Sequence, residues 1–144
     1  MLKVFLTDDD EDDRLFFEEA IEAIAVNTEL KLFNNGEELM NYLLSDDAVL
    51  PNLLFLDLNM PIKNGMECLQ EIKASDKLKD IIIAIYSTSS SEQDVENTFI
   101  NGANIYINKP NNFKALKKSI EKVLKINWQY NTSNLNRETF LLRI

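Results

Sequence analysis

The sequence predicts an α/β domain in which a parallel β-sheet is covered by helices on both faces. Short apolar runs of strand-like composition alternate five times with longer segments whose apolar residues recur at helical spacing. Two of the runs, residues 52–58 and 80–87, are apolar almost throughout, which is typical of strands buried on both faces. The length of 144 residues fits one domain.

Each expected strand is short and is followed by polar residues. Residues 29–33 alternate polar and apolar side chains and therefore predict a half-exposed strand, whereas the other runs are more uniformly apolar. In chain order, the expected strands are residues 2–6, 29–33, 52–58, 80–87 and 104–108. Parallel strands separated by helices require right-handed crossovers.

A helix is expected after each strand. The second expected helix opens with Asn35, three residues before Glu38, in a pattern similar to a capping box. Gly102 is expected to close the fourth, because glycine commonly ends helices. The expected helices are residues 14–25, 34–44, 65–75, 91–103 and 112–126.

The division expected along the chain is a domain over residues 1–126 and a C-terminal tail over residues 127–144. The tail starts polar and ends in an apolar cluster at Phe140, Leu141 and Leu142. Such a cluster could extend the last helix, pack on its own domain, or contact a partner or a second copy in a homodimer.

Composition excludes several classes of function. The chain has no histidine and one cysteine, Cys68, so Ser-His-Asp or Cys-His catalysis and a Cys-rich zinc site are excluded. The net charge of −9 argues against general binding to nucleic acid. No apolar run approaches the ~20 residues of a membrane span, and the first residues do not form a secretory signal. We therefore expect a cytoplasmic protein with no membrane partner.

Reactive side chains follow four of the expected strands. Asp8 and Asp9 follow the first, Asp57 lies at the end of the third, Ser87 ends the fourth, and Lys109 follows the fifth. Ligands bind at the carboxyl ends of strands in open α/β sheets, so these groups should meet. Three carboxylates in one pocket need more than one lysine for neutralisation, and a hard divalent cation with oxygen ligands fits. The set suits a phosphoryl group carried on a carboxylate.

Four segments carry a resemblance to a known family: "FLTDDDEDDR", "LLFLDLNMPIKNG", "AIYSTSS" and "GANIYINKP". In this order and spacing they resemble the receiver domain of bacterial two-component response regulators, over about residues 2–126. The resemblance is strongest to stand-alone regulators of the chemotaxis and phytochrome-associated kind. It implies a flavodoxin-like (βα)5 fold with strand order 2-1-3-4-5.

The resemblance assigns roles to particular residues. Asp57 would be the phosphorylated residue. Asp8 and Asp9 would hold Mg²⁺ or Mn²⁺ together with Asp57 and the backbone carbonyl of Asn59. Ser87 would be the hydroxyl that turns toward the phosphoryl group.

Two more family roles fall near the fifth strand. Lys109 would pair with the phosphoryl group, and its bond to Pro110 would be cis. Tyr106 would be the aromatic residue that rotates inward on activation.

The chain departs from chemotaxis regulators by having Leu58, rather than tryptophan, just after the acceptor aspartate. Ser89 and Asn59 occupy positions that tune the lifetime of the phosphoryl group.

The implied function is that of a signalling switch rather than a classical enzyme. A separate histidine kinase or histidine phosphotransfer protein would phosphorylate Asp57 in a Mg²⁺-dependent reaction, within a two-component system or phosphorelay. The protein would catalyse only its own phosphorylation and dephosphorylation. The modified domain would then change a surface that binds an unidentified downstream protein.

Three alternative functions compete with this one. A phosphorylation-independent adaptor or dimerisation module of the same fold remains open because of the apolar tail. An aspartate-nucleophile phosphatase would use Asp8 and Asp10, but Asp12 stands where that motif needs Thr or Val. A calcium loop starting at Asp8 lacks its glycine, because Asp13 stands there.

Charges on the first and last expected helices are opposite. Glu11, Asp12 and Asp13 are interpreted as a solvated helix start, where acidic residues favour the helix dipole. The last helix is rich in lysine. With strand order 2-1-3-4-5 these helices lie on the same side of the sheet, so the expectation is that they neutralise each other rather than bind nucleic acid.

Overall fold

The computed structural model describes residues 1–126 and 140–142. Within these residues, β-strands and α-helices alternate along the chain and a sixth strand follows the last helix. The strands are β1 (Leu2–Thr7), β2 (Thr28–Phe33), β3 (Leu53–Leu56), β4 (Ile82–Ser87), β5 (Ile105–Asn108) and β6 (Leu141–Leu142). The helices are α1 (Glu11–Glu22), α2 (Gly36–Leu43), α3 (Gly65–Ala74), α4 (Glu92–Ile100) and α5 (Phe113–Leu124).

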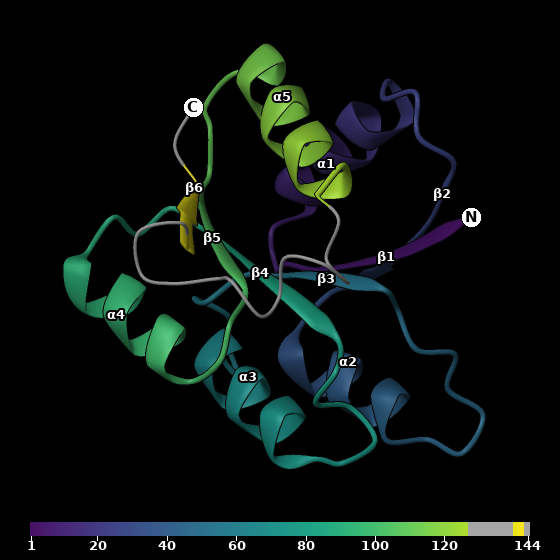
Figure 1. Cartoon of the computed structure of the whole chain (residues 1–144), viewed down its shortest axis with the longest axis vertical. Coiled ribbons are helices and arrows are strands. Elements are labelled where there is room, and N and C mark those ends of the chain that lie inside the picture. The colour runs from purple at the N-terminus through teal and green to yellow at the C-terminus, as the bar shows by residue number, and fades with distance from the viewer. Residues whose placement is uncertain (127–139, 143–144) are drawn as a thin grey trace.

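All strand pairs in the described part of the chain are parallel, and the sheet order is β2-β1-β3-β4-β5-β6. Helices α1 and α5 cover one face of the sheet, and α2, α3 and α4 cover the other (Figure 1). The predicted α/β class, the two helical layers and the strand order 2-1-3-4-5 are therefore confirmed. The sixth strand was not predicted.

The sheet separates two apolar cores. One core packs α2, α3 and α4 against side chains such as Leu54, Leu56 and Ile83. The other packs α1 and α5 against alternate residues of the same strands, including Leu53, Phe55 and Ala84. Because successive side chains in a strand point to opposite faces, β3 and β4 must be apolar at nearly every position. This explains why residues 52–58 and 80–87 show no polar alternation.

Helix α1 begins at Glu11 and ends at Glu22, three residues earlier at each end than predicted. Asp10 is its N-cap and accepts a hydrogen bond from the backbone N–H of Asp13. The acidic run therefore forms the cap and first turn of the helix, where negative charge is favourable. The prediction was wrong because it followed the apolar stripe and not the cap.

Caps account for most of the other helix boundaries. Asn35 caps α2 by accepting a hydrogen bond from Glu38 N–H at 2.8 Å, as predicted. Asn64 and Glu67 form a reciprocal capping box at α3. Gly102, with φ of +95°, follows α4 in the left-handed conformation that glycine adopts without strain.

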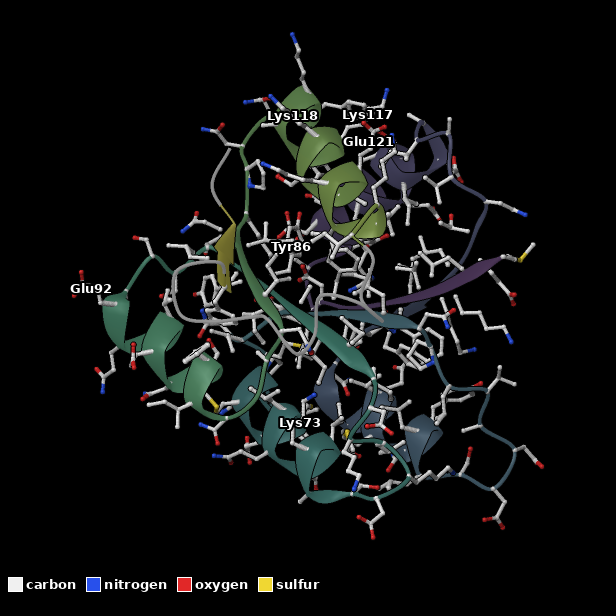
Figure 2. The ribbon with its side chains drawn as sticks, in the orientation of Figure 1. Lys73, Tyr86, Glu92, Lys117, Lys118 and Glu121 are labelled. Carbon is white, nitrogen blue, oxygen red and sulfur yellow. The ribbon has the colours of Figure 1, made fainter. Side chains whose placement is uncertain are left out.

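Helices α1 and α5 lie side by side, as the strand order 2-1-3-4-5 predicts (Figure 1). Their contact includes an edge-to-face pair of Phe16 and Phe113, with ring centroids 5.9 Å apart. Lys118 extends away from the body of the protein (Figure 2). In the described part of the chain, an ion pair joins Asp13 on α1 to Lys109, which lies just before α5. The two helices therefore contact through apolar side chains, and charge neutralisation is concentrated at one end.

No helix in the described part of the chain is long and apolar enough to cross a membrane.

Candidate functional site

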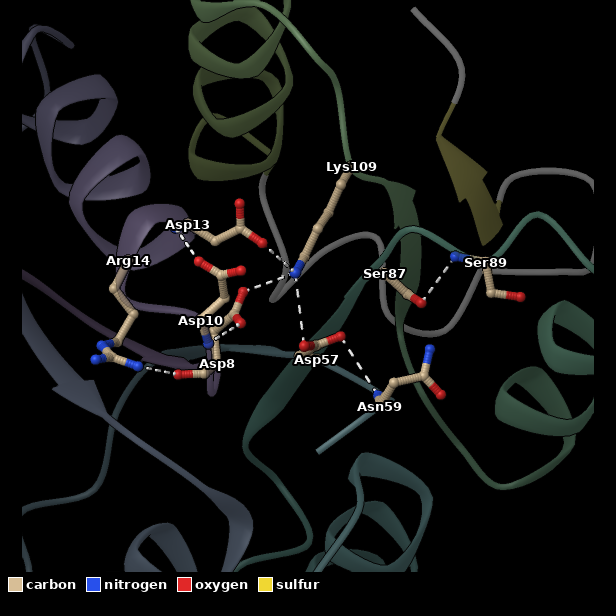
Figure 3. Close-up of polar contacts among 9 residues, drawn as sticks. All are labelled: Asp8, Asp10, Asp13, Arg14, Asp57, Asn59, Ser87, Ser89 and Lys109. Atoms are coloured by element: carbon tan, nitrogen blue, oxygen red, sulfur yellow. Dashed lines mark hydrogen bonds and ion pairs between the residues drawn. The ribbon is translucent and has the colours of Figure 1, made fainter. Parts of the chain in front are cut away.

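Four strand ends bring the predicted side chains to one edge of the sheet (Figure 3). Asp8 follows β1, Asp57 follows β3, Ser87 ends β4 and Lys109 follows β5. Backbone hydrogen bonds continue beyond the strands and set their relative heights: Asp57 N–H donates to the carbonyl of Thr7 at 3.0 Å, and Lys109 N–H donates to that of Ser87 at 2.8 Å. The side chains therefore start from nearly the same level above the sheet.

Lys109 lies among three carboxylates. Its Nζ is 2.8 Å from Asp8 Oδ2, 2.9 Å from Asp13 Oδ2 and 3.5 Å from Asp57 Oδ2. The Lys109 side chain is only 8% exposed, and those of Asp8 and Asp57 are 0% and 7% exposed. The ammonium group also lies over the ring of Tyr86, 5.1 Å from its centroid, where a cation is attracted to the π-electrons. One buried cation thus balances a larger negative charge.

Asp13 also contacts this site, which its sequence pattern did not indicate. Asp13 was assigned to a solvated helix start, but its carboxylate accepts a hydrogen bond from Lys109. Arg14 was also missed: its Nη1 donates to the carbonyl of Asp8 at 2.7 Å and holds the backbone before the helix. Both residues reach the site because α1 begins at Glu11. The capping signal of Asp10 with Asp13 could have indicated this start.

Burial of the site changes its proton affinities. Burial raises the pKa of Asp57 to about 7, because desolvation and the charge of Asp8 outweigh the opposing effect of Lys109. Burial would lower the pKa of Lys109, but hydrogen bonds to Asp8 and Asp13 and the charge of Asp57 hold it above its ordinary value. Lys109 therefore remains charged, while ionisation of Asp57 is disfavoured unless a further cation offsets its charge.

Asp8, Asp9 and Asp57 form a set of candidate metal ligands. One carboxylate oxygen from each residue lies within 4.8 Å of the others, with Asp8 and Asp57 buried and Asp9 exposed. Asp8 Oδ1 accepts a hydrogen bond from Asp10 N–H, and the buried Asp8 Oδ2 lies 2.8 Å from Lys109 Nζ. An all-oxygen set with unbalanced negative charge fits Mg²⁺ or Mn²⁺.

Asn59 lies beside this set. Its backbone N–H donates to Asp57 Oδ1 at 3.4 Å, which places the start of the loop after β3 against the carboxylate (Figure 3). The expected role of the Asn59 carbonyl as a ligand stays a prediction.

Ser87 and Tyr106 belong to a second group of contacts, centred on Ser89. Ser87 is fully buried, and its Oγ accepts a hydrogen bond from Ser89 N–H at 3.1 Å (Figure 3). The Ser89 carbonyl accepts from the hydroxyl of Tyr106 at 2.8 Å and from the Asn108 side chain at 3.2 Å. Tyr106 is fully buried, so its ring points inward. In this arrangement the strand end, the loop after it and β5 are linked.

The loop between β3 and α3 has a strained backbone. Ile62 has φ of 69°, in a tight turn closed by a hydrogen bond from Lys63 N–H to the carbonyl of Pro61. This conformation is rare for a β-branched residue and costs about 1–3 kcal/mol. Ile62 is also 74% exposed. Nothing in its residue type indicated the turn.

Gly65 brings this loop close to the backbone at the end of β3, beside Asp57. Its N–H donates to the carbonyl of Leu58 at 3.0 Å, and a Cβ at this position would overlap the backbone carbonyl of Asp57. We expect Gly65→Ala to lower the free energy of unfolding by about 1–3 kcal/mol, because α3 or the Asp57 backbone must move. Urea unfolding measures this, with Gln70→Ala on the exposed side of α3 as the control. Equal stability of the two variants would contradict the close approach.

The Lys109–Pro110 bond is trans, because no cis peptide bond occurs in the described part of the chain. The expected cis bond is therefore corrected. The trans form is the intrinsically preferred one even before proline. In this form Lys109 still donates its N–H to Ser87 and reaches all three carboxylates.

Comparisons with known proteins agree with this geometry. The family model described as "Response regulator receiver domain" matches residues 4–121. The response regulator Rcp1 of Synechocystis sp. is 32% identical over 124 residues, covering 83% of this chain and 84% of Rcp1. The probable methanogenesis regulatory protein FilR2 of Methanothrix harundinacea is 28% identical over 123 residues, covering 83% of this chain and 79% of FilR2.

Solved structures give the same result. The Mn²⁺-bound form of Rcp1 superposes with a TM-score of 0.78 at 28% identity, covering 94% of this chain and 98% of that one. The phosphorylated cyanobacterial phytochrome response regulator RcpA superposes with a TM-score of 0.79 at 32% identity, covering 94% and 96% of the two chains. Together, the fold, the clustered carboxylates and these matches show that the chain belongs to the response regulator receiver domain family.

Proposed function

We propose that Asp57 is the phosphorylated residue of this receiver domain and that Lys109, Asp8, Asp9 and Ser87 support its phosphorylation. Receiver domains obtain phosphoryl groups from histidine kinases and act on downstream proteins as signalling switches. The observation that carries the assignment is the placement of Lys109 Nζ between the buried carboxylates of Asp8 and Asp57. A buried cation beside an otherwise unbalanced carboxylate cluster is suited to a group with several anionic oxygens.

The transfer requires an ionised Asp57. One carboxylate oxygen attacks the phosphorus of a phosphohistidine on the donor protein, a P–O bond forms, the P–N bond breaks, and the leaving imidazole takes up a proton. The donor histidine belongs to another protein or segment, because these 144 residues contain no histidine. The protein catalyses only this transfer and the later hydrolysis of its own acyl phosphate.

Asp8, Asp9 and Asp57, with the carbonyl of Asn59, would hold Mg²⁺ or Mn²⁺. When bound, the metal ion neutralises charge on the carboxylates and on the phosphoryl oxygens. Lys109 pairs with a phosphoryl oxygen from the side of β5, and the Ser87 hydroxyl donates to another. The Mn²⁺-bound form of Rcp1 supports a divalent ion in this type of domain. The cytoplasmic location expected from the sequence stays a prediction.

Three observations weaken the alternative functions. A phosphatase that used Asp10 as an acid would need its carboxyl free, but this group caps α1 by accepting from Asp13 N–H at 3.1 Å. The adaptor hypothesis was motivated by an apolar tail, but Phe140 is buried against its own domain. Calcium binding by an EF-hand loop is also excluded, because β1 precedes the acidic run and α1 begins within it.

Intact mass after incubation with acetyl phosphate tests the proposal. We expect the wild-type chain with Mg²⁺ to gain one phosphoryl group and the Asp57→Asn variant to gain none. EDTA should abolish the adduct. Asp12→Asn is the matched control, because Asp12 is an exposed acid on the first turn of α1, and it should label normally. Labelling of Asp57→Asn at the wild-type level would contradict the site.

A further inference from the structure

The last described residues add a strand to the sheet next to the proposed switch. Leu141 and Leu142 pair in parallel with Tyr106 and Ile107 of β5. Figure 1 shows this short strand, β6, along the outer side of β5. We refer to residues 140–142 as the strap. It covers a strand edge that would otherwise present unpaired backbone groups.

Phe140 anchors the strap. Its side chain is 1% exposed and lies between two aromatic rings. The centroid of Phe140 is 6.1 Å from that of Tyr106 and 5.3 Å from that of Phe99 on α4, and both pairs are edge-to-face. Favourable edge-to-face contacts and burial of a whole phenyl ring depend on the positions of both partners. The strap is therefore positioned by the ring of Tyr106 as well as by the β5 backbone.

Tyr106 is in turn linked to the phosphorylation site. Its hydroxyl donates to the carbonyl of Ser89, and Ser89 N–H donates to Ser87 Oγ. Ser87 ends β4 at the edge of the sheet where Asp57 lies (Figure 3). A continuous set of contacts thus runs from Ser87 through Ser89 and Tyr106 to Phe140. The strap touches the end of this set that is farthest from Asp57.

Inward Tyr106 and the docked strap are in direct contact, so each stabilises the position of the other. If the Tyr106 ring swings out, Phe140 loses one of its two aromatic contacts and the core beneath β6 is left with a cavity. If the strap leaves, the Tyr106 ring loses the contact that covers it. Two events that each stabilise the same position of one side chain are coupled, and the coupling is reciprocal.

We propose that docking of the strap on β5 and phosphorylation of Asp57 stabilise each other through the inward position of Tyr106. The inference rests on the proposed function, in which the Ser87 hydroxyl donates to the phosphoryl group, and on the expected inward position of Tyr106 in the activated domain. The strap is a segment of the same chain, so it reports the state of Asp57 on the surface formed by α4, β5 and α5. A downstream protein that adds its own strand to β5 must displace it.

A groove beside the strap is lined by residues of the strap, of β5 and of the phosphorylation site. Leu141 lines it together with Tyr106, Val95 and residues 108–112, which include Lys109. The wall of the groove is therefore shared by the strap, the switch tyrosine and the lysine of the site. Undocking of the strap changes the surface offered to any partner that binds here.

The first test is the affinity for beryllofluoride, a mimic of the phosphoryl group, measured with Mg²⁺ on the full chain. Phe140→Ala should bind beryllofluoride about fivefold more weakly than the wild type, a typical size for coupling between sites. Met40→Ala is the matched control, because Met40 is a buried apolar residue of the same core on α2, remote from β5. It should keep the wild-type affinity. Equal or tighter binding by Phe140→Ala would overturn the inference.

The second test measures docking of the strap directly, by hydrogen exchange. Backbone hydrogen exchange at Leu141 and Leu142 should slow when beryllofluoride and Mg²⁺ are added, and should not respond in Asp57→Asn. Protection that rises with protein concentration would show that the strap docks on a second copy and would overturn docking within one chain. Unchanged exchange, in protein that binds beryllofluoride, would also overturn the inference. If the wild type binds no beryllofluoride, the proposed function fails instead, and that result is distinct.

Discussion

Replacing Lys109 by methionine is expected to lower the free energy of unfolding of the metal-free protein by about 3 kcal/mol at pH 8, the usual cost of removing one partner of a buried ion pair. Lys109 Nζ lies within 3.5 Å of Asp8, Asp13 and Asp57. Methionine keeps much of the apolar contact of the lysine stem but leaves the buried carboxylates unpaired. Urea unfolding in the presence of EDTA measures the effect.

Two controls separate this charge effect from general damage. Lys118→Met, on the exposed side of α5, should leave stability unchanged within about 0.5 kcal/mol, as surface substitutions usually do. The defect of Lys109→Met should shrink when Mg²⁺ is added or the pH is lowered, because either change offsets the negative charge. A defect of the same size under all three conditions would show that the lysine stem, not its charge, stabilises the site.

Asp57→Asn is expected to stabilise the metal-free protein in a pH-dependent way. The pKa of Asp57 rises from 3.8 to about 7 on folding, so the folded protein binds this proton more tightly than the unfolded chain. The stability contributed by this proton is present below pH 4 and is lost as the pH rises through 7. Asparagine cannot ionise, so the stability of the variant does not fall in this way as the pH rises.

The stability gain of Asp57→Asn should therefore be about 2–3 kcal/mol larger at pH 8 than at pH 5, at about 1.4 kcal/mol per pKa unit. Urea unfolding in EDTA at the two pH values measures it. Mg²⁺ should reduce the gain at pH 8, because a bound cation favours the ionised wild-type carboxylate. Asp12→Asn, which changes an exposed acid, should show no such pH dependence. A gain that is independent of pH would contradict the raised pKa.

The main site residues could be predicted because each lies at the end of a strand or directly after it. The alternation of strands and helices predicts a parallel sheet. In such a sheet the carboxyl ends of the strands share one edge, and this alone places Asp8, Asp57, Ser87 and Lys109 together. The structure brings all four there. Their chemistry was then readable from residue type, because carboxylates and one lysine at a shared edge require a cation.

Asp13 was harder to predict because its role depends on where a helix starts. Because α1 begins three residues earlier than predicted, Asp13 lies in its first turn, where its carboxylate reaches Lys109. Apolar periodicity placed the start at residue 14, while the cap at Asp10 places it at Glu11. Helix ends are set by local hydrogen bonds that compete with the hydrophobic pattern, and here the cap decided.

The strap could not be predicted from local pattern. Two leucines are too few to show the alternation of a strand, and their pairing depends on an open edge at β5 and on a hole for Phe140 between Tyr106 and Phe99. Both are properties of the folded domain. Ile62 is a similar case: the closure of the loop after β3 imposes a positive φ on a residue type that disfavours it.

The most direct test of the central claim is to locate the phosphoryl group. The chain is phosphorylated with acetyl phosphate and Mg²⁺ and then treated with borohydride, which reduces the acyl phosphate to an alcohol and releases phosphate. Peptide mass spectrometry then identifies the reduced residue. Homoserine at position 57, with Asp8, Asp9 and Asp13 unchanged, is the predicted result. Reduction at any of these three residues, with Asp57 intact, would contradict the account.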